Sequence, residues 1–191
     1  LDADDVMPPK SIASRLEVFF DHPDTDFVDG AARTMNATLT KELNKYRPSF
    51  IGDPYLELIS LSGKCFFGNT WLMRWGPDRK ERFHEGISHG EDLLFYIAHG
   101  PGKRYRYTSE TVLLYRRTRD SSMSDLKGLD ASYRVIENVL KTIRPPIPWS
   151  TLMQYRIRSR RAMLGAFWHN REYWQMVRSL LTRPIGRTKT S

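Results

Sequence analysis

The chain has 191 residues, 40% of them hydrophobic, which is enough for one domain with a buried core. Its single cysteine, Cys65, excludes an internal disulfide and a cysteine-rich zinc site. The net charge of +8 lies entirely in residues 149–191, which carry eight Arg, one Lys and one Glu, whereas residues 1–148 are neutral overall. This distribution favours a neutral domain with a basic attachment helix over a uniformly basic nucleic-acid binder, so we expect no nucleic-acid partner.

Three acidic residues, Asp2, Asp4 and Asp5, follow Leu1 at the start of the sequence. The segment is typical of the end of a buried strand, and we expect the chain to be a fragment of a longer protein. Asp2 and Asp4 offer hard oxygen ligands two residues apart, which suit Mg²⁺ or Mn²⁺. A cluster that caps the following helix explains the same residues equally well.

The next elements are predicted from the spacing of apolar residues. Residues 11–20 are expected to form a helix whose apolar face consists of Ile12, Leu16, Phe19 and Phe20. The pattern then predicts, in order, a strand and turn at Phe27–Gly30, a loop over 31–52, a short helix over 54–61, and extended segments at 65–67 and 70–74.

A pair of carboxylates, Glu91 and Asp92, stands directly before the apolar run 93–98, with Gly90 ahead of it and Gly100 behind. This pattern predicts a short helix with acidic residues in its first turn. The exposed amides of a helix N-terminus stabilise carboxylates, and this alone is a sufficient explanation for them. The alternative is that one carboxylate faces a cleft and acts as a general base.

The C-terminal part is predicted to be mostly helical. Its elements are strands at 105–107 and 111–115, a helix over 126–143, a proline-rich linker over 145–148, and a long helix over 149–181 that breaks near Asn170. An apolar stripe accompanies the arginines of the long helix: Leu164, Phe167, Trp168, Trp174, Val177 and Leu181. The arginines either form a solvated face on a packed helix or contact anionic lipid, and nucleic acid is the least favoured interpretation.

Taken in order, several of these segments resemble the family-2 glycosyltransferases of the GT-A fold, of the bacterial non-processive type. The matching segments are Leu1–Asp5 with Pro9 and Leu16, Phe27-Val28-x-Gly30, Gly68–Leu72 with Arg74, Phe83-x-Glu85, Gly90–Phe95, Leu114-Tyr115-x-Arg117 and Ser121-Ser122-x-Ser124. The Asp-x-Asp pair is weak by itself, but the ordered set is fairly specific. The resemblance covers residues 1–125 and implies a partial GT-A domain of α/β layers, without the half that forms the nucleotide-base pocket.

The resemblance implies an inverting glycosyltransferase of the hexosyltransferase type. It would move a sugar from a nucleotide-diphosphate donor to the hydroxyl of a saccharide or lipid-linked acceptor, in bacterial polysaccharide or glycolipid synthesis. Asp4, assisted by Asp2, would hold Mg²⁺ or Mn²⁺ and the donor diphosphate. Asp92 would remove the acceptor proton, and Glu91 would orient the acceptor or hold the helix start.

Four further residues belong to the implied site. Arg117 and Arg119 would neutralise the diphosphate from the loop after the last strand. Glu85 is assigned to acceptor binding. Trp71 either packs on a sugar face or belongs to the core, and the core is the favoured alternative.

We therefore expect two parts, the C-terminal half of a GT-A domain over residues 1–144 and a proline-rich linker with a basic amphipathic helical tail over 145–191. The expected location is the cytoplasm, with the tail on the inner face of the cytoplasmic membrane. A different class of function stays open, namely a non-catalytic α/β module whose basic helix binds an anionic membrane or a partner protein.

Overall fold

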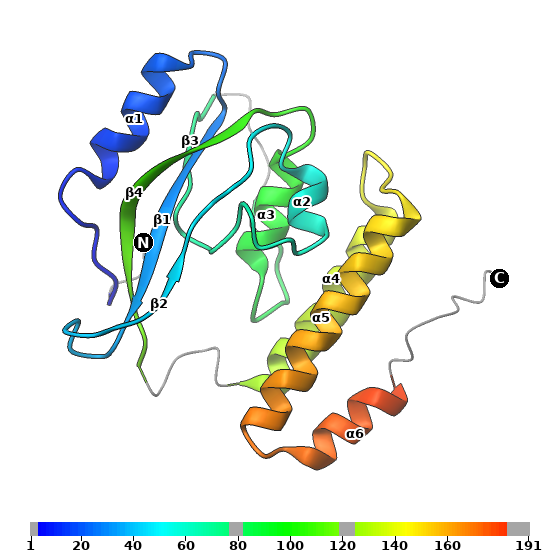
Figure 1. The fold of residues 1–191 in the computed structure, drawn as a ribbon. Helices are drawn as coiled ribbons and strands as arrows, with labels where there is room; N and C mark the ends of the chain where they lie inside the picture. Colours follow the sequence, from blue (N-terminus) through cyan, green and yellow to red (C-terminus); the bar gives the residue numbers. More distant parts are fainter. Residues whose placement is uncertain (1–3, 77–81, 119–124, 183–191) are drawn as a thin grey trace.

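The computed structural model describes residues 4–76, 82–118 and 125–182, which form a mixed sheet flanked by helices (Figure 1). The elements of these residues, in chain order, are α1 (Ser11–Asp21), β1 (Phe27–Met35), β2 (Glu42–Tyr46), α2 (Tyr55–Ile59), β3 (Leu72–Met73), α3 (Glu91–His99), β4 (Tyr105–Arg116), α4 (Leu126–Thr142), α5 (Trp149–His169) and α6 (Tyr173–Thr182). The α/β class predicted from the sequence is confirmed.

The central strand of the sheet is β1. Its first six residues, Phe27–Ala32, are all buried, so both of its faces are covered there. The strand pairs in parallel with β4 along its whole length. On its other edge, β3 pairs antiparallel with the start of β1, and β2 pairs antiparallel with its end.

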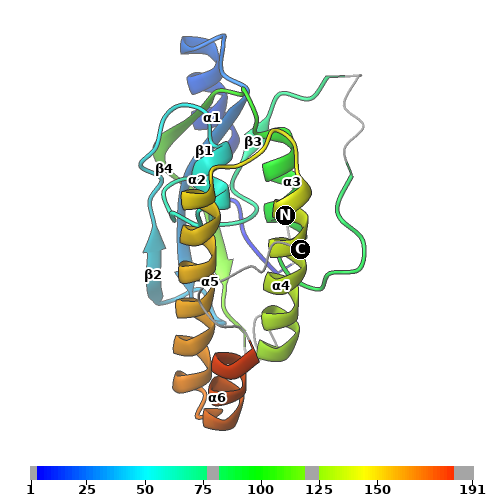
Figure 2. The ribbon, with the colours of Figure 1, turned by 90° about the vertical axis from the view of Figure 1, so that its right-hand side faces the viewer.

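Helices lie on both sides of this sheet. Figure 1 shows α1 on one side, where it packs on β4 and β1, and α2 and α3 on the other. The helices α4 and α5 run side by side as a hairpin, which Figure 2 shows from a second direction. The main core lies between the sheet and these helices, and its fully buried members include Phe27, Leu58, Ile59, Ile97, Tyr105, Ile136, Leu140 and Tyr155.

The helix α5 shares this core. Tyr155 on α5 is completely buried, and its hydroxyl donates a hydrogen bond of 2.9 Å to the backbone carbonyl of Tyr133 on α4. The proline-rich linker at 145–148 therefore connects α4 to a helix that packs in the same core. The predicted break near Asn170 is confirmed by the end of α5 and the start of α6. Within the described ranges, we find no helix that joins the length and the apolar character required to cross a bilayer.

The loop predicted over residues 31–52 is wrong, because β1 continues to Met35 and Glu42–Tyr46 forms β2. The error came from interpreting Gly30 as a turn residue. A Cβ at Gly30 would lie only 2.4 Å from Cγ1 of Val112 on β4. Glycine stands in the middle of this strand because a neighbouring side chain occupies the space that a Cβ would need.

The predicted inner face of α1 is also largely wrong. Of its four apolar residues only Phe19 is buried, whereas Phe20 is 86% exposed, and Ile12 and Leu16 are exposed as well. The buried face is polar and centres on Arg15, whose guanidinium donates hydrogen bonds of 2.9 Å to the Ser11 carbonyl and 2.7 Å to the Thr70 carbonyl. These bonds to backbone acceptors compensate for the loss of water and allow a charged residue to be buried there.

A fully buried carboxylate, Asp29, lies on β1 in the middle of the sheet. It accepts hydrogen bonds from the hydroxyls of Tyr105, at 2.7 Å, and Tyr46, at 2.8 Å, and from the Gly30 amide, at 2.7 Å. Burial raises the pKa of Asp29, and the hydrogen bonds that stabilise its charged form offset only part of that effect. The fold therefore binds a proton at Asp29 more tightly than the unfolded chain does.

We expect Gly30→Ala to lower the free energy of unfolding by about 1–3 kcal/mol, because the new methyl group overlaps the Val112 side chain. Val112→Ala removes the obstructing methyls, so adding Gly30→Ala to that variant should cost less than it costs the wild type. Urea unfolding of the four proteins gives this coupling as a double-mutant cycle. Gly165→Ala is the control, because open space surrounds that position on α5. Purely additive losses would contradict the proposed contact.

The second expectation concerns pH. A group whose folded pKa is raised contributes stability that is present in full below its unfolded pKa and is lost as the pH rises through its folded pKa. For Asp29 we expect the free energy of unfolding to fall above about pH 4, by at most ~1.4 kcal/mol per pH unit. Asp29→Asn should remove this decline, whereas Asp21→Asn, at an exposed carboxylate, should retain it. Denaturant unfolding at several pH values measures both, and equal slopes in the two variants would refute the assignment.

Candidate functional site

The start of α3 holds the paired carboxylates that the sequence singled out. Gly90 adopts a φ of 79°, a left-handed conformation that favours glycine, and α3 begins at the next residue. Asp92 accepts a hydrogen bond of 2.7 Å at its Oδ1 from the Leu93 amide. Oε2 of Glu91 is buried and has no hydrogen-bond partner among the described residues. The prediction of a short helix with an acidic first turn is confirmed.

A cleft of about 520 Å³ opens at this helix start. Segments from five parts of the described chain line it, and its residues are Asp5, Thr34, Phe67, Gly68, Asn69, Phe83, Ser88, His89, Gly90, Glu91, Asp92, Leu113 and Tyr115. Thr34 and Tyr115 lie opposite each other near the carboxyl ends of the parallel strands β1 and β4. Ligands of open α/β sheets characteristically bind at this edge.

The acidic segment reaches the cleft through β4. Val6 forms an antiparallel bridge to Leu114, with amide-to-carbonyl distances of 3.1 and 2.8 Å. The carboxylate of Asp5 lines the cleft and accepts a hydrogen bond of 2.9 Å from the Arg116 amide. Asp4 is exposed and does not line the cleft, although its carbonyl accepts a hydrogen bond of 2.8 Å from Nε of Arg116. The structure thus adds Asp5, which the sequence analysis did not assign.

The predicted divalent metal rests on Asp4 and Asp2, and Asp2 lies outside the described residues. Where the structure describes the chain, no three His, Cys, Asp or Glu side chains converge as a set of metal ligands. A Mg²⁺ or Mn²⁺ ion bound through one or two carboxylates would take its other ligands from phosphate and water. Asp4 is exposed and precedes the cleft residue Asp5, and its role as a metal ligand stays a prediction.

The loop at Gly68 passes close to the carboxylate of Asp92. A Cβ built at Gly68 would lie 3.5 Å from Oδ2 of Asp92, so the loop backbone passes directly beside that oxygen. The φ of Gly68 is 124°, which also favours glycine. The Gly68-Asn69 and Glu91-Asp92 motifs, separate in the sequence, are therefore neighbours in one wall of the cleft.

The structure places Trp71 in the core and makes the proposed sugar contact wrong. The indole is 7% exposed and packs against the rings of Tyr96, at 4.5 Å between centroids, Tyr105, at 4.9 Å, and Phe27, at 5.1 Å. Its Nε1 donates a hydrogen bond of 2.9 Å to the Cys65 carbonyl. The core alternative is confirmed, and no face of the indole is left for a ligand.

Glu85 and Arg117, two further residues of the predicted site, do not line the cleft. Glu85 is exposed in the loop before α3, and Arg117 is exposed just after β4. The Arg117 amide donates a hydrogen bond of 2.9 Å to the Met35 carbonyl, which holds its backbone at the end of the sheet. Arg119 lies outside the described residues.

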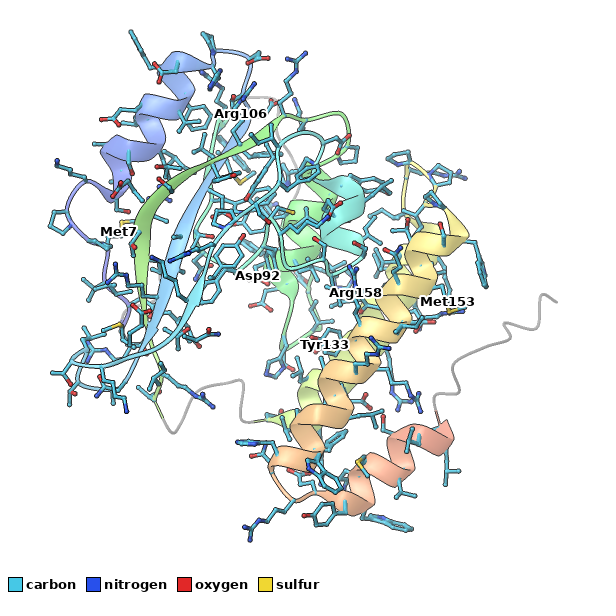
Figure 3. The ribbon with its side chains drawn as sticks, viewed as in Figure 1. Met7, Asp92, Arg106, Tyr133, Met153 and Arg158 are labelled. Carbon is cyan, nitrogen blue, oxygen red and sulfur yellow. The ribbon has the colours of Figure 1, made fainter. Side chains whose placement is uncertain are left out.

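A second cavity, of about 400 Å³, lies between α2, α3, α4 and α5 and adjoins the cleft. Its apolar walls include Leu58, Leu61, Phe66, Leu93, Leu129, Tyr133 and Ile136. Four residues line both spaces: Phe67, His89, Gly90 and Asp92. Figure 3 shows Asp92, Tyr133 and Arg158 around the junction of α3 with the α4–α5 hairpin. The walls come from helices that are separate in the sequence, so no local sequence pattern indicates this cavity.

His89 is a further residue that the sequence analysis left unassigned. It is 7% exposed and lines both the cleft and the apolar cavity. Its Nδ1 lies 2.9 Å from Oγ of Ser88. The imidazole of His89 therefore lies in the same cleft wall as Asp92, which follows it by three residues in the sequence.

Comparison with known proteins gives no assignment: no protein-family model and no curated protein matches this chain. The resemblance to family-2 glycosyltransferases rests on the quoted motifs. The site described above rests on the convergence of their residues in space.

Proposed function

We propose that this chain is part of an inverting glycosyltransferase with a GT-A catalytic domain. One observation carries the proposal, namely that a single cleft is lined by Asp5, Gly68, Asn69, Glu91, Asp92 and Tyr115. These residues belong to four segments that are separate in the sequence and that the family resemblance groups together. Motifs that matched by chance would have no reason to meet on one surface.

In the proposed reaction, the acceptor hydroxyl attacks the anomeric carbon of the donor sugar from the face opposite the diphosphate. The carboxylate of Asp92 takes the hydroxyl proton as the new carbon–oxygen bond forms. The bond from the anomeric carbon to the diphosphate oxygen breaks, and the nucleoside diphosphate leaves with the electron pair. A bound Mg²⁺ or Mn²⁺ ion, held by Asp4 and Asp2, would supply charge neutralisation for that leaving group.

The neighbours of Asp92 keep its carboxylate in position. Its Oδ1 accepts a hydrogen bond from the Leu93 amide, and its Oδ2 lies close to Gly68 in the cleft wall. Glu91 lines the same cleft next to Asp92, and this place in the cleft wall supports its proposed role in orienting the acceptor. These positions support one carboxylate as the base and the other as the group that orients the acceptor.

A second candidate role, attachment to an anionic membrane surface, is favoured by α6. Trp174 is 75% exposed and Leu181 is 77% exposed, and both lie on the same helix as the exposed Arg178. Trp168, at the end of α5, is also exposed, and its ring contacts Tyr173 at 5.3 Å between centroids. Aromatic side chains next to arginines are typical of a segment that lies in the membrane interface. This role is compatible with catalysis and also with the non-catalytic module.

We expect Asp92→Asn to lower kcat by a factor of about 10²–10⁴, because the amide cannot accept the proton. Binding of the nucleotide sugar should stay within about twofold of the wild type, since Asp92 is assigned to the acceptor side. The assay uses the complete natural gene product, a panel of nucleotide sugars and added Mn²⁺, with Asp21→Asn as the matched control. Transfer by Asp92→Asn at the wild-type rate would exclude Asp92 as the base, and absence of both nucleotide binding and transfer in the wild type would exclude the enzyme.

For the membrane role, Trp174→Gln should weaken co-sedimentation with vesicles of phosphatidylglycerol and phosphatidylcholine by about tenfold. The matched control is Trp149→Gln, because Trp149 is 66% exposed at the first residue of α5, the end of that helix far from α6. Asp4→Ala should leave the binding intact. Equal losses in the two tryptophan variants, or undiminished binding to neutral vesicles, would argue against α6 as the attachment surface.

A further inference from the structure

The polar cleft and the apolar cavity share four lining residues, and Asp92 is the carboxylate among them. The polar residues Asp5, Thr34, Glu91 and Tyr115 also line the cleft. The cavity is walled mainly by aliphatic and aromatic side chains. A ligand group beside Asp92 therefore has a polar space and an apolar space close to it.

The apolar cavity is built from packed elements. Leu58 and Ile136 are each 1% exposed, so the walls that they form belong to the main core. At the rim, Nη1 of Arg158 donates hydrogen bonds of 2.8 Å to the Ser60 carbonyl and 3.3 Å to the Ser60 hydroxyl. These bonds join α5 to the residue that follows α2. The cavity thus stands between fixed elements and has a size within the usual range for small-ligand sites.

Two of the charged residues on the cavity wall have partners within the fold. Glu57 pairs with Lys64 at 3.5 Å, and Arg158 is bonded to Ser60 as described. Asp92 lines the cavity as well as the cleft. The side of the cavity that adjoins the cleft therefore carries the proposed base.

We propose that this cavity binds an apolar group of the acceptor, so that the acceptor is amphipathic. Its hydroxyl reaches Asp92, and an alkyl or aromatic group on the same molecule lies among the partly exposed side chains of Leu61, Phe66 and Leu129. This assignment rests on the proposed glycosyl transfer, because that reaction is what makes Asp92 the site of the acceptor hydroxyl. A purely hydrophilic sugar would leave the apolar walls in contact with water, whereas an apolar substituent removes them from it.

The test compares two acceptor probes that carry the same sugar, n-octyl β-D-glucoside below its micelle concentration and methyl β-D-glucoside. Calorimetry measures their binding to the complete natural gene product. Because each buried methylene group strengthens binding by roughly fourfold, the octyl compound should bind at least ~50-fold more tightly. Equal binding of the two probes would overturn the proposal.

A variant at the rim of the cavity shows whether the octyl chain binds there. Ala162 is exposed on α5 and lines the cavity, so Ala162→Trp should narrow the opening without replacing a core residue. We expect it to weaken binding of the octyl glucoside at least tenfold while leaving the thermal unfolding midpoint unchanged. The matched control, Ala13→Trp, introduces the same side chain at an exposed position of α1 and should have no effect. Trp174→Gln tests for binding at the exposed tail, and a loss there equal to that of Ala162→Trp would overturn the cavity assignment.

Transfer assays separate this inference from the proposed function. A preference for the octyl over the methyl acceptor in KM, abolished by Ala162→Trp, supports both. Transfer to both acceptors with KM values within twofold would keep the glycosyltransferase and overturn the acceptor cavity. Octyl glucoside binding that Ala162→Trp weakens, in a protein that neither binds nor transfers any nucleotide sugar, would overturn the acceptor assignment and the enzyme together.

Discussion

The close parallel pairing of β1 with β4 determines where the other described elements can lie. It depends on Gly30, which leaves room for the Val112 side chain, and on Asp29, whose carboxylate accepts a hydrogen bond from Tyr105 across the pair. Parallel strands cannot be joined by a tight turn, so the chain between them must travel back over the sheet. Residues 36–104 make that connection, and they include α2, β3 and α3.

The candidate site follows from this connection. Because α3 is the last helix before β4, its N-terminal carboxylates lie near the carboxyl end of β1, where Thr34 lines the same cleft. The outer edge of β4 binds Val6 through backbone hydrogen bonds, which brings Asp5 to the same place. Segments from the start and the middle of the chain therefore reach one cleft because they are all attached to the same two strands.

Local patterns predicted the elements that depend on neighbouring residues. The helices α3 and α4 and the break near Asn170 carry capping, periodicity and stop signals within a few residues, and they were predicted correctly. The extent of β1 and the inner face of α1 depend on partners far along the chain, namely Val112 for Gly30 and Thr70 for Arg15. Apolar periodicity cannot detect a polar face that is satisfied by hydrogen bonds to a distant backbone.

The same limit applies to the site. Glu91 and Asp92 were predicted from a helix start, and the structure brings them to a cleft with the other motif segments. The selection of Asp5 in place of Asp4 as a cleft residue is decided by its hydrogen bond to the Arg116 amide, which no local pattern encodes. The apolar cavity is formed by four helices, α2, α3, α4 and α5, so it arises only when these helices pack together.

The arginines of α5 are not all exposed to solvent. Arg156 pairs with Glu137 at 2.9 Å, and Arg160 is only 3% exposed and donates to the Ser179 carbonyl. The Arg156 charge is balanced locally by a carboxylate that the net charge of +8 already includes, whereas the buried Arg160 charge is bonded to a neutral carbonyl. Counterions in solution will gather mainly around the exposed cations of α5 and α6, and the positive field of the protein will be concentrated there.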